Sequence, residues 1–280
     1  GFLFSQNTRE NALFFRNLRI LILGITLPLI VAELTLYTFS QNTLSRELDA
    51  ANMRALNKVQ SIMDLIVEET TSISLRISID PSVQSFLSLP QAPYSDYRSI
   101  EMAQRSIYTM QISQRLNIDH SITLYSGLHD YILHTESGSQ RLSMFSDRPC
   151  IELYRDEQGY EEQIWYALRS ARISSDPALQ PAPVITQYRR ITANDPRQID
   201  FVAVNLEIGH LNALIGSVRQ DDNSELVVVD KSGRILISSQ HQDLALPLAD
   251  YLADTASAEQ IRQTAQGALH LDLAGQKMRL

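Results

Sequence analysis

Cysteine is almost absent from the sequence, because the 280 residues include only Cys150. A single thiol cannot form a disulfide within the chain, so the fold does not depend on internal cross-links. A basic excess is also lacking: 24 lysines and arginines face 32 aspartates and glutamates, which gives a net charge of −8. A chain with this balance repels a phosphate backbone. We therefore expect no nucleic-acid partner within this chain.

Catalytic and cofactor motifs are lacking as well. The sequence contains no P-loop, no dinucleotide fingerprint and no G-x-S-x-G nucleophile motif. No two of the six histidines have the i, i+4 spacing of a helical zinc site. Cys150 follows Pro149 without a local catalytic signature, which favours a buried structural thiol. We therefore expect no enzyme, no metal site and no cofactor.

A long apolar segment is present near the N-terminus, over residues 18–39. Its centre, Ile20–Ala32, carries no charge. A helix of roughly 20 residues spans a bilayer core of about 30 Å, a length reached here if Glu33 lies near one membrane face. Three arginines precede this uncharged centre, at positions 9, 16 and 19. By the positive-inside rule we predict a cytoplasmic N-terminus over 1–17, a transmembrane helix over 18–39 and an extracellular location for residues after about 40.

Two other interpretations of residues 18–39 remain open. The uninterrupted apolar core is short, and Ile30-Val31-Ala32 loosely resembles a signal-peptide cleavage site. A buried core helix is the third possibility. The apolar pattern resumes after Glu33 and continues into a long helix, which favours a retained membrane anchor.

The stretch from 41 to 78 contains no glycine and no proline. Apolar or small side chains recur in it every three or four positions, at Leu44, Leu48, Ala51, Ala55, Val59, Ile62, Ile66, Thr70, Ile73 and Ile77. This spacing forms one face of a helix. We predict a stalk or core helix over 41–78. The stripe could pack on its own domain or against a parallel dimer partner, and both are open.

The remainder of the sequence predicts short helices followed by alternating strands. Asp80-Pro81 begins a helix that ends near Leu89, and a second helix covers 97–117. Strands follow at 121–126, 131–134, 163–168, 184–191 and 201–206, then a helix at 208–218, a hairpin over 225–238, a helix at 247–266 and an incomplete hairpin over 268–280. This order predicts an α+β fold with two antiparallel sheet modules. Because the last hairpin is cut off, we expect the chain to be part of a longer protein.

The order of several segments resembles the extracytoplasmic double Cache sensor regions of Gram-positive membrane receptors. After the apolar span these segments are AANMRALNKVQSIMDLIVEETTSISLRISIDPSVQSFLSLP, ITLYS, DYILHTE, IWYAL, PVITQYRRI, FVAVNLEIGHLNALIG and ELVVVDKSGRILISS. The chain looks most like the sensors of AraC-type helix-turn-helix regulators, and next most like those of histidine kinases. The resemblance implies a membrane-distal PAS-like module over 79–207 and the start of a membrane-proximal module over 208–280.

By this resemblance the chain senses a small solute and controls an output domain beyond Leu280, as a homodimer. Amino-acid-binding members carry an arginine two positions before the tryptophan and an aspartate in the strand before the next helix, where this chain has Gln163 and Asn205. Without these charges an amino acid is disfavoured. A neutral polyol or sugar-like solute is favoured. The predicted ligand-binding residues are Trp165, Asn205, Tyr166, Gln163, Tyr125 and Tyr188.

Two other classes of protein remain open from the sequence. A secreted hydrolase would have a cleaved signal peptide and would occur free in the medium. A structural surface protein would bind no small molecule. Neither class is favoured by the segments that carry the resemblance.

Overall fold

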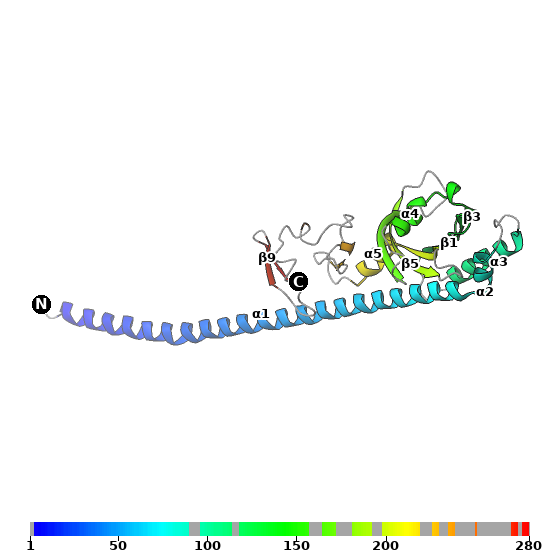
Figure 1. Ribbon diagram of the computed structural model, residues 1–280. Helices are drawn as coiled ribbons and strands as arrows, with labels where there is room; N and C mark the ends of the chain where they lie inside the picture. The colour runs from blue at the N-terminus through cyan, green and yellow to red at the C-terminus, as the bar shows by residue number, and fades with distance from the viewer. Residues whose placement is uncertain are drawn as a thin grey trace. The chain divides into compact units, whose positions relative to one another are not determined.

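The computed structural model describes residues 3–89, 96–113, 118–156, 164–171, 181–191, 198–218, 226–229, 235–238, 250, 270–273 and 276–279. The chain divides into two compact units, Gly1–Arg54 and Ala55–Leu280. Helix α1 (Leu3–Ile79) runs through both. Figure 1 shows the elements in chain order from blue to red.

The first unit is formed by α1. Large apolar side chains between residues 21 and 39 are exposed in it, among them Leu27, Leu29, Ile30, Leu34 and Phe39. In the part of the chain that the structure describes, no helix combines the length and the apolar character needed to cross a membrane. The transmembrane helix over 18–39 therefore stays a prediction.

The second unit contains the buried half of the predicted helical stripe. Ala55, Val59, Ile66, Ile73 and Ile77 are each at most 7% exposed, whereas Leu44 and Leu48 in the first unit are 53% and 46% exposed. The core-helix interpretation is thus confirmed from Ala55 onward. The dimer interpretation of the same stripe stays a prediction.

Helices α2 (Pro81–Leu87) and α3 (Tyr97–Ile112) follow α1. The Asp80 carboxylate caps α2 by accepting hydrogen bonds from the backbone N–H groups of Ser82 at 2.8 Å and Val83 at 3.2 Å, as its position before Pro81 predicts. Helix α3 ends at Ile112, before the predicted limit of 117, and Ser113 is its C-cap. Residues 114–117 lie outside the described part of the chain.

A six-stranded antiparallel sheet with strand order β3-β2-β1-β6-β5-β4 forms the centre of the second unit. Its strands are β1 (His120–Ser126), β2 (Tyr131–His134), β3 (Gly138–Arg141), β4 (Ile164–Ala171), β5 (Ala182–Ile191) and β6 (Asp200–Glu207). A 3-10 turn, η2 (Leu142–Met144), and helix α4 (Arg148–Asp156) lie between β3 and β4 along the chain. The prediction of an α+β fold is confirmed, but it missed β3 and α4.

Helix α5 (Ile208–Gly216) and two hairpins follow the sheet along the chain. The hairpins pair β7 (Val227–Val229) with β8 (Ile235–Ser238) and β9 (His270–Leu273) with β10 (Gln276–Arg279). These strands agree with the predicted hairpins. The predicted helix over 247–266 lies outside the described residues apart from Asp250.

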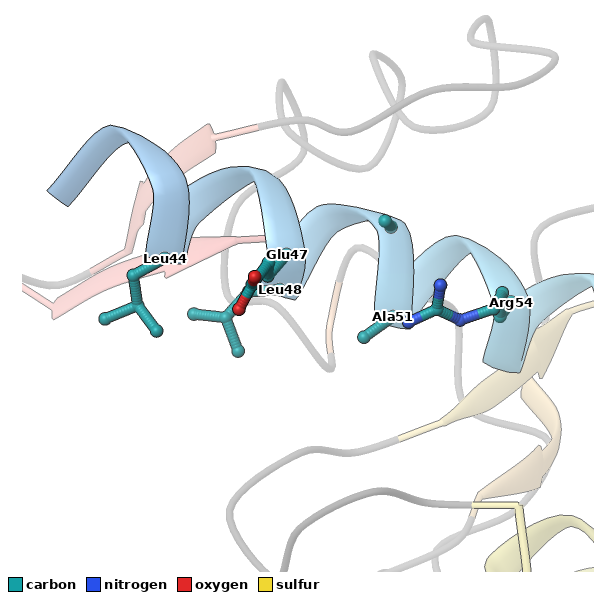
Figure 2. Close-up of a pocket in the computed structure, with 6 residues that line it drawn as sticks. Leu44, Glu47, Leu48, Ala51 and Arg54 are labelled. Carbon is teal, nitrogen blue, oxygen red and sulfur yellow. The ribbon is translucent and has the colours of Figure 1, made fainter. Parts of the chain in front are cut away.

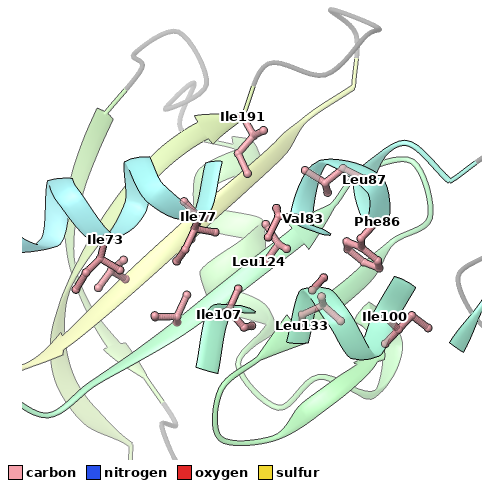
Figure 3. Close-up of a cluster of buried hydrophobic side chains, with 14 residues drawn as sticks. Ile73, Ile77, Val83, Phe86, Leu87, Ile100, Ile107, Leu124, Leu133 and Ile191 are labelled. Carbon is pink, nitrogen blue, oxygen red and sulfur yellow. The ribbon is translucent and has the colours of Figure 1, made fainter. Parts of the chain in front are cut away.

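The two faces of the central sheet are covered by different helices (Figure 1). One face packs against α1, α2 and α3, and Figure 3 shows Ile77, Val83, Phe86, Ile107 and Leu124 meeting there. Burying each such side chain contributes about 1.5–3 kcal/mol. The other face carries α4 and an aromatic cluster that contains Tyr125, Tyr154, Tyr188 and Phe201.

Gly127, which follows β1, lies where two backbone segments approach each other closely. A Cβ at this position would lie 2.5 Å from the backbone oxygen of Ile199, while the N–H of Gly127 donates to Asp200 Oδ1 at 2.8 Å. We expect Gly127→Ala to lower the free energy of unfolding by about 2 kcal/mol, because backbone atoms must shift. Urea unfolding of the full chain in mild detergent measures this.

Gly216→Ala is the matched control, because among the described residues no atom outside its own helix turn and chain neighbours lies within 4 Å of a Cβ placed there. We expect that variant to be as stable as the wild type or slightly more stable. Equal stability of the two alanine variants would contradict the close approach at Gly127.

Candidate ligand-binding site

The face of the sheet that α4 covers carries a row of polar side chains from three neighbouring strands. Ser121 of β1 pairs in register with Asn205 of β6, which pairs with Thr186 of β5. All three are buried. The next row on this face places Thr123, Ala203 and Tyr188 side by side, because side chains two residues apart point to the same face.

Asn205 is the centre of the polar row. Its Oδ1 accepts hydrogen bonds from Arg169 Nη2 and Thr186 Oγ1, both at 2.8 Å. Its Nδ2 donates to Ser121 Oγ at 3.0 Å. Four strands are thereby connected through one amide. The ligand-binding role of Asn205 stays a prediction.

A buried ion pair lies beside the amide. Arg169 Nη1 donates to Asp147 Oδ1 at 2.8 Å, and the two side chains are 6% and 5% exposed. Arg169 Nε also donates to Thr186 Oγ1 at 2.8 Å. Burial raises the pKa of the Asp147 carboxyl, and the guanidinium opposes this rise. The two charges cancel, so the polar row has no net charge from this pair.

His134 lies in the next row, opposite Thr123, as a neutral imidazole. Burial lowers its pKa to about 4, and the nearby Arg169 contributes in the same direction. Its Nδ1 accepts hydrogen bonds from the backbone N–H groups of Ser137 at 3.1 Å and Glu136 at 3.3 Å. The ring meets Phe145 edge-on at 5.5 Å between centroids. A proton on Nδ1 would break these bonds.

Aromatic rings fill the part of this face nearest α4. Tyr154 of α4 stacks on Tyr188 with centroids 5.0 Å apart and lies 4.4 Å from Phe201. Phe201 lies 5.3 Å from Tyr125. The Tyr188 hydroxyl donates to the backbone oxygen of Cys150 at 3.0 Å. Burial raises the pKa of the Cys150 thiol to about 11, which agrees with the predicted structural role.

The six predicted ligand-binding residues are brought together only in part. Tyr125, Tyr188 and Asn205 share the face under α4, as described above. Trp165 is opposite Tyr188 in the β4–β5 register, but its side chain lies outside what the structure describes, and Gln163 lies outside it altogether. Tyr166 is on the opposite face, 43% exposed, where its hydroxyl accepts a hydrogen bond from Gln187 at 2.8 Å.

Sequence reasoning missed Arg169 and Asp147. Arg169 is four residues after Trp165 in one strand, so a period-two count along β4 would have placed both on one face. No comparable signal marks Asp147, which meets Arg169 across 22 positions of sequence. Thr123, Ser121 and Thr186 were missed because hydroxyl residues are common in strands.

Two hollows lie away from this face of the sheet, and they are less suited to a solute. Figure 2 shows a depression in the first unit that is lined by Leu44, Glu47, Leu48, Ala51 and Arg54, all on α1. One helix surface cannot enclose a ligand. In the second unit, a small hollow is lined by residues that include Glu69, Thr70 and His120. Neither has the converging strands of the site under α4.

Comparison with known proteins gives structural relatives only. No family model and no curated protein matches the chain. The isoleucine-bound sensory domain of the Campylobacter jejuni chemoreceptor Tlp3 matches with a TM-score of 0.53 at 14% identity, over 85% of this chain and 89% of that one. The periplasmic sensory domain of the C. jejuni chemoreceptor Tlp1 matches with a TM-score of 0.56 at 12% identity, over 84% and 89%. This chain shares their fold.

A third structure extends the comparison to kinases. The extracellular domain of the putative histidine kinase vpHK1S-Z8 matches with a TM-score of 0.50 at 15% identity, over 82% of both chains. All three relatives are sensory or extracellular domains by description. At this level of identity the likeness establishes the helix-plus-antiparallel-sheet fold of the chain.

The neutral state of His134 predicts a pH dependence of stability. Its pKa is about 4 in the folded chain against 6.5 for an ordinary histidine, so its contribution is complete above pH 6.5 and is lost as the pH falls toward 4. We expect a loss of about 3 kcal/mol over this window. Urea unfolding of the full chain between pH 7.5 and 4.5 measures it.

The control compares two histidine variants. His134→Gln should reduce the pH dependence, and His120→Gln should reduce it separately, because burial lowers the pKa of both imidazoles. Asp147 and Asp200 have pKa values raised by burial and change stability in the opposite direction in all three proteins. Parallel profiles for wild type and His134→Gln would contradict the assignment.

Proposed function

We propose that the chain is the extracytoplasmic sensory region of a membrane-anchored signalling protein and binds a small solute under α4. The observation that carries this proposal is the double role of β5. Thr186 and Tyr188 belong to the candidate site. The alternate residues of the same strand, Gln187 and Arg189, contact α1. One strand therefore connects the solute site with the helix that leads toward the N-terminus.

The contacts between β5 and α1 are specific hydrogen bonds. Gln187 Nε2 donates to Thr71 Oγ1 at 2.8 Å, and Arg189 Nε donates to Ser74 Oγ at 2.9 Å. A solute that moves β5 would therefore displace Thr71 and Ser74 of α1. It can shift the arrangement of α1 only by its difference in affinity for the two arrangements, which is a few kcal/mol for an effective switch.

The structural relatives support a sensory function. Two classes of output domain remain as candidates. The sequence resemblance favours an AraC-type transcription regulator beyond Leu280. The likeness to the extracellular domain of a putative histidine kinase supports a two-component kinase equally well. Dimerisation through the stripe on α1 belongs to the same proposal, because it would bring two output domains together.

For the solute we propose a neutral polyol or sugar-like molecule. The Arg169–Asp147 pair cancels its own charge, and His134 is neutral, so the site offers no free charge to an ionic ligand. Aromatic faces beside planar polar groups suit such a molecule. Amino acids are the alternative, because the related Tlp3 domain has isoleucine bound.

The solute and its effect on α1 can be measured together. We expect thermal-shift screening of the full chain in mild detergent, against sugars, polyols, amino acids and small carboxylates, to find a stabilising solute. That solute should slow amide hydrogen exchange in β5 and in residues 66–78 of α1. In the double variant Gln187→Leu, Arg189→Leu the protection of β5 should remain and that of α1 should disappear.

Tyr166→Phe is the matched control, because it removes the other partner of Gln187 and leaves the Thr71 contact in place. It should keep the protection of α1. Undiminished protection of α1 in the double leucine variant would contradict coupling through β5, and stabilisation by no solute would contradict the sensory function itself.

Membrane anchorage by residues 18–39 completes the proposal. It is supported by exposed apolar side chains on all sides of α1 between residues 21 and 39, as in a helix surrounded by lipid. We expect the chain to stay in the membrane fraction after alkaline carbonate extraction. Protease added to intact cells should digest the part after residue 40.

Charge substitutions provide the control for anchorage. The double variant Leu27→Arg, Ile30→Arg should be extracted, since each arginine at the centre of a span costs about 3 kcal/mol, while Leu44→Arg should stay in the membrane. A wild-type chain found free in the medium would support the secreted hydrolase instead.

A further inference from the structure

The hydroxyl of Thr123 is an unused hydrogen-bonding group in the middle of the candidate site. Thr123 is fully buried, and its Oγ1 has no hydrogen-bond partner among the residues that the structure describes. Burying a hydroxyl without a partner is unfavourable, and native proteins rarely do so without a reason. The partner is therefore expected to come from outside the described chain.

The neighbours of Thr123 make the position a natural contact for a solute. In register it lies between His134 of β2 and Ala203 of β6, and Tyr188 is the next residue across the sheet. Ala203 is the smallest side chain in this row. Ser121 and Asn205 of the adjacent row already bond each other. The buried hydroxyl thus belongs to a row that also contains Tyr188 and His134, next to the row of Ser121 and Asn205.

The ion pair also has hydrogen-bonding capacity left over. A guanidinium has five N–H donors. Within the described chain Arg169 uses three, one on each nitrogen, toward Thr186, Asp147 and Asn205. Asp147 accepts the arginine bond through Oδ1 and a second hydrogen bond from the backbone N–H of Cys150, and a carboxylate can accept about four. Spare donors and a spare acceptor therefore lie next to each other.

We propose that Thr123, Arg169 and Asp147 recognise adjacent hydroxyl groups of an uncharged polyhydroxylated solute. This inference rests on the proposed sensory function and names the solute contacts within that site. A hydroxyl group both donates and accepts, so one can donate to Asp147 while its neighbour accepts from Arg169. An anion would compete with Asp147 for the guanidinium, and a cation would be repelled by it.

Thr123→Val tests the proposal without disturbing the fold. Valine has nearly the same shape, and no hydrogen bond within the described chain is lost, so thermal stability without solute should be equal or higher. Affinity for a stabilising polyol should fall about tenfold, because one hydroxyl contact is removed. Titration of the full chain in detergent with D-ribose, D-galactose and myo-inositol measures both quantities.

Thr135→Val is the matched control, because the buried Thr135 hydroxyl accepts a hydrogen bond from the N–H of Ile122 at 3.0 Å. It should lose thermal stability and keep its polyol affinity. Equal polyol affinity of wild type and Thr123→Val would overturn the inference while the sensory function stands. Stabilisation by L-isoleucine or succinate but by none of the three polyols would also overturn it. If no solute of any class stabilises the chain, the proposed function fails as well.

Discussion

The alternation of side chains along β5 is the constraint on which both the site and its link to α1 depend. Thr186 and Tyr188 point to one face, and Gln187 and Arg189 to the other. A slip by one residue would exchange the two sets. Arg189 would then leave Ser74, and Thr186 would leave Asn205. Because hydrogen bonds on both faces oppose the slip, the register that forms the site is the register that holds the helix.

Local signals explain how much of the fold could be predicted. The cap at Asp80 and the strands β1, β5 and β6 follow from residues that are neighbours in sequence, and their positions were predicted to within two residues at each end. The sequence of β3 is GSQR, which contains no apolar residue, so no apolar–polar alternation marks it as a strand. α4 is short and begins with Arg148 and Pro149, so its apolar residues are too few to show a helical period.

The site could be predicted less completely, since its parts meet only through tertiary pairing. Asn205, Tyr188 and Tyr125 could be assigned to strands from the sequence, and these strands bring them to one face of the sheet. The comparison with amino-acid-binding sensors treated Gln163 and Asn205 as evidence that charge is missing. The structure places a positive and a negative side chain on the same face from other positions, Arg169 and Asp147. Charge is therefore present in the site and is cancelled there.

The buried Arg169–Asp147 pair, whose charges cancel, is better explained by solute recognition than by a contribution to stability. Replacing a buried ion pair with apolar side chains of similar volume often leaves a protein equally stable, whereas removing one partner is costly. Apolar or aromatic side chains like those around Phe201 could have filled the space that Arg169 and Asp147 occupy. What an ion pair adds is a donor and an acceptor held at fixed positions next to Asn205, one row away from the unpaired Thr123 hydroxyl. Burying these polar groups costs desolvation free energy, and hydrogen bonds from a solute with hydroxyl groups would offset that cost.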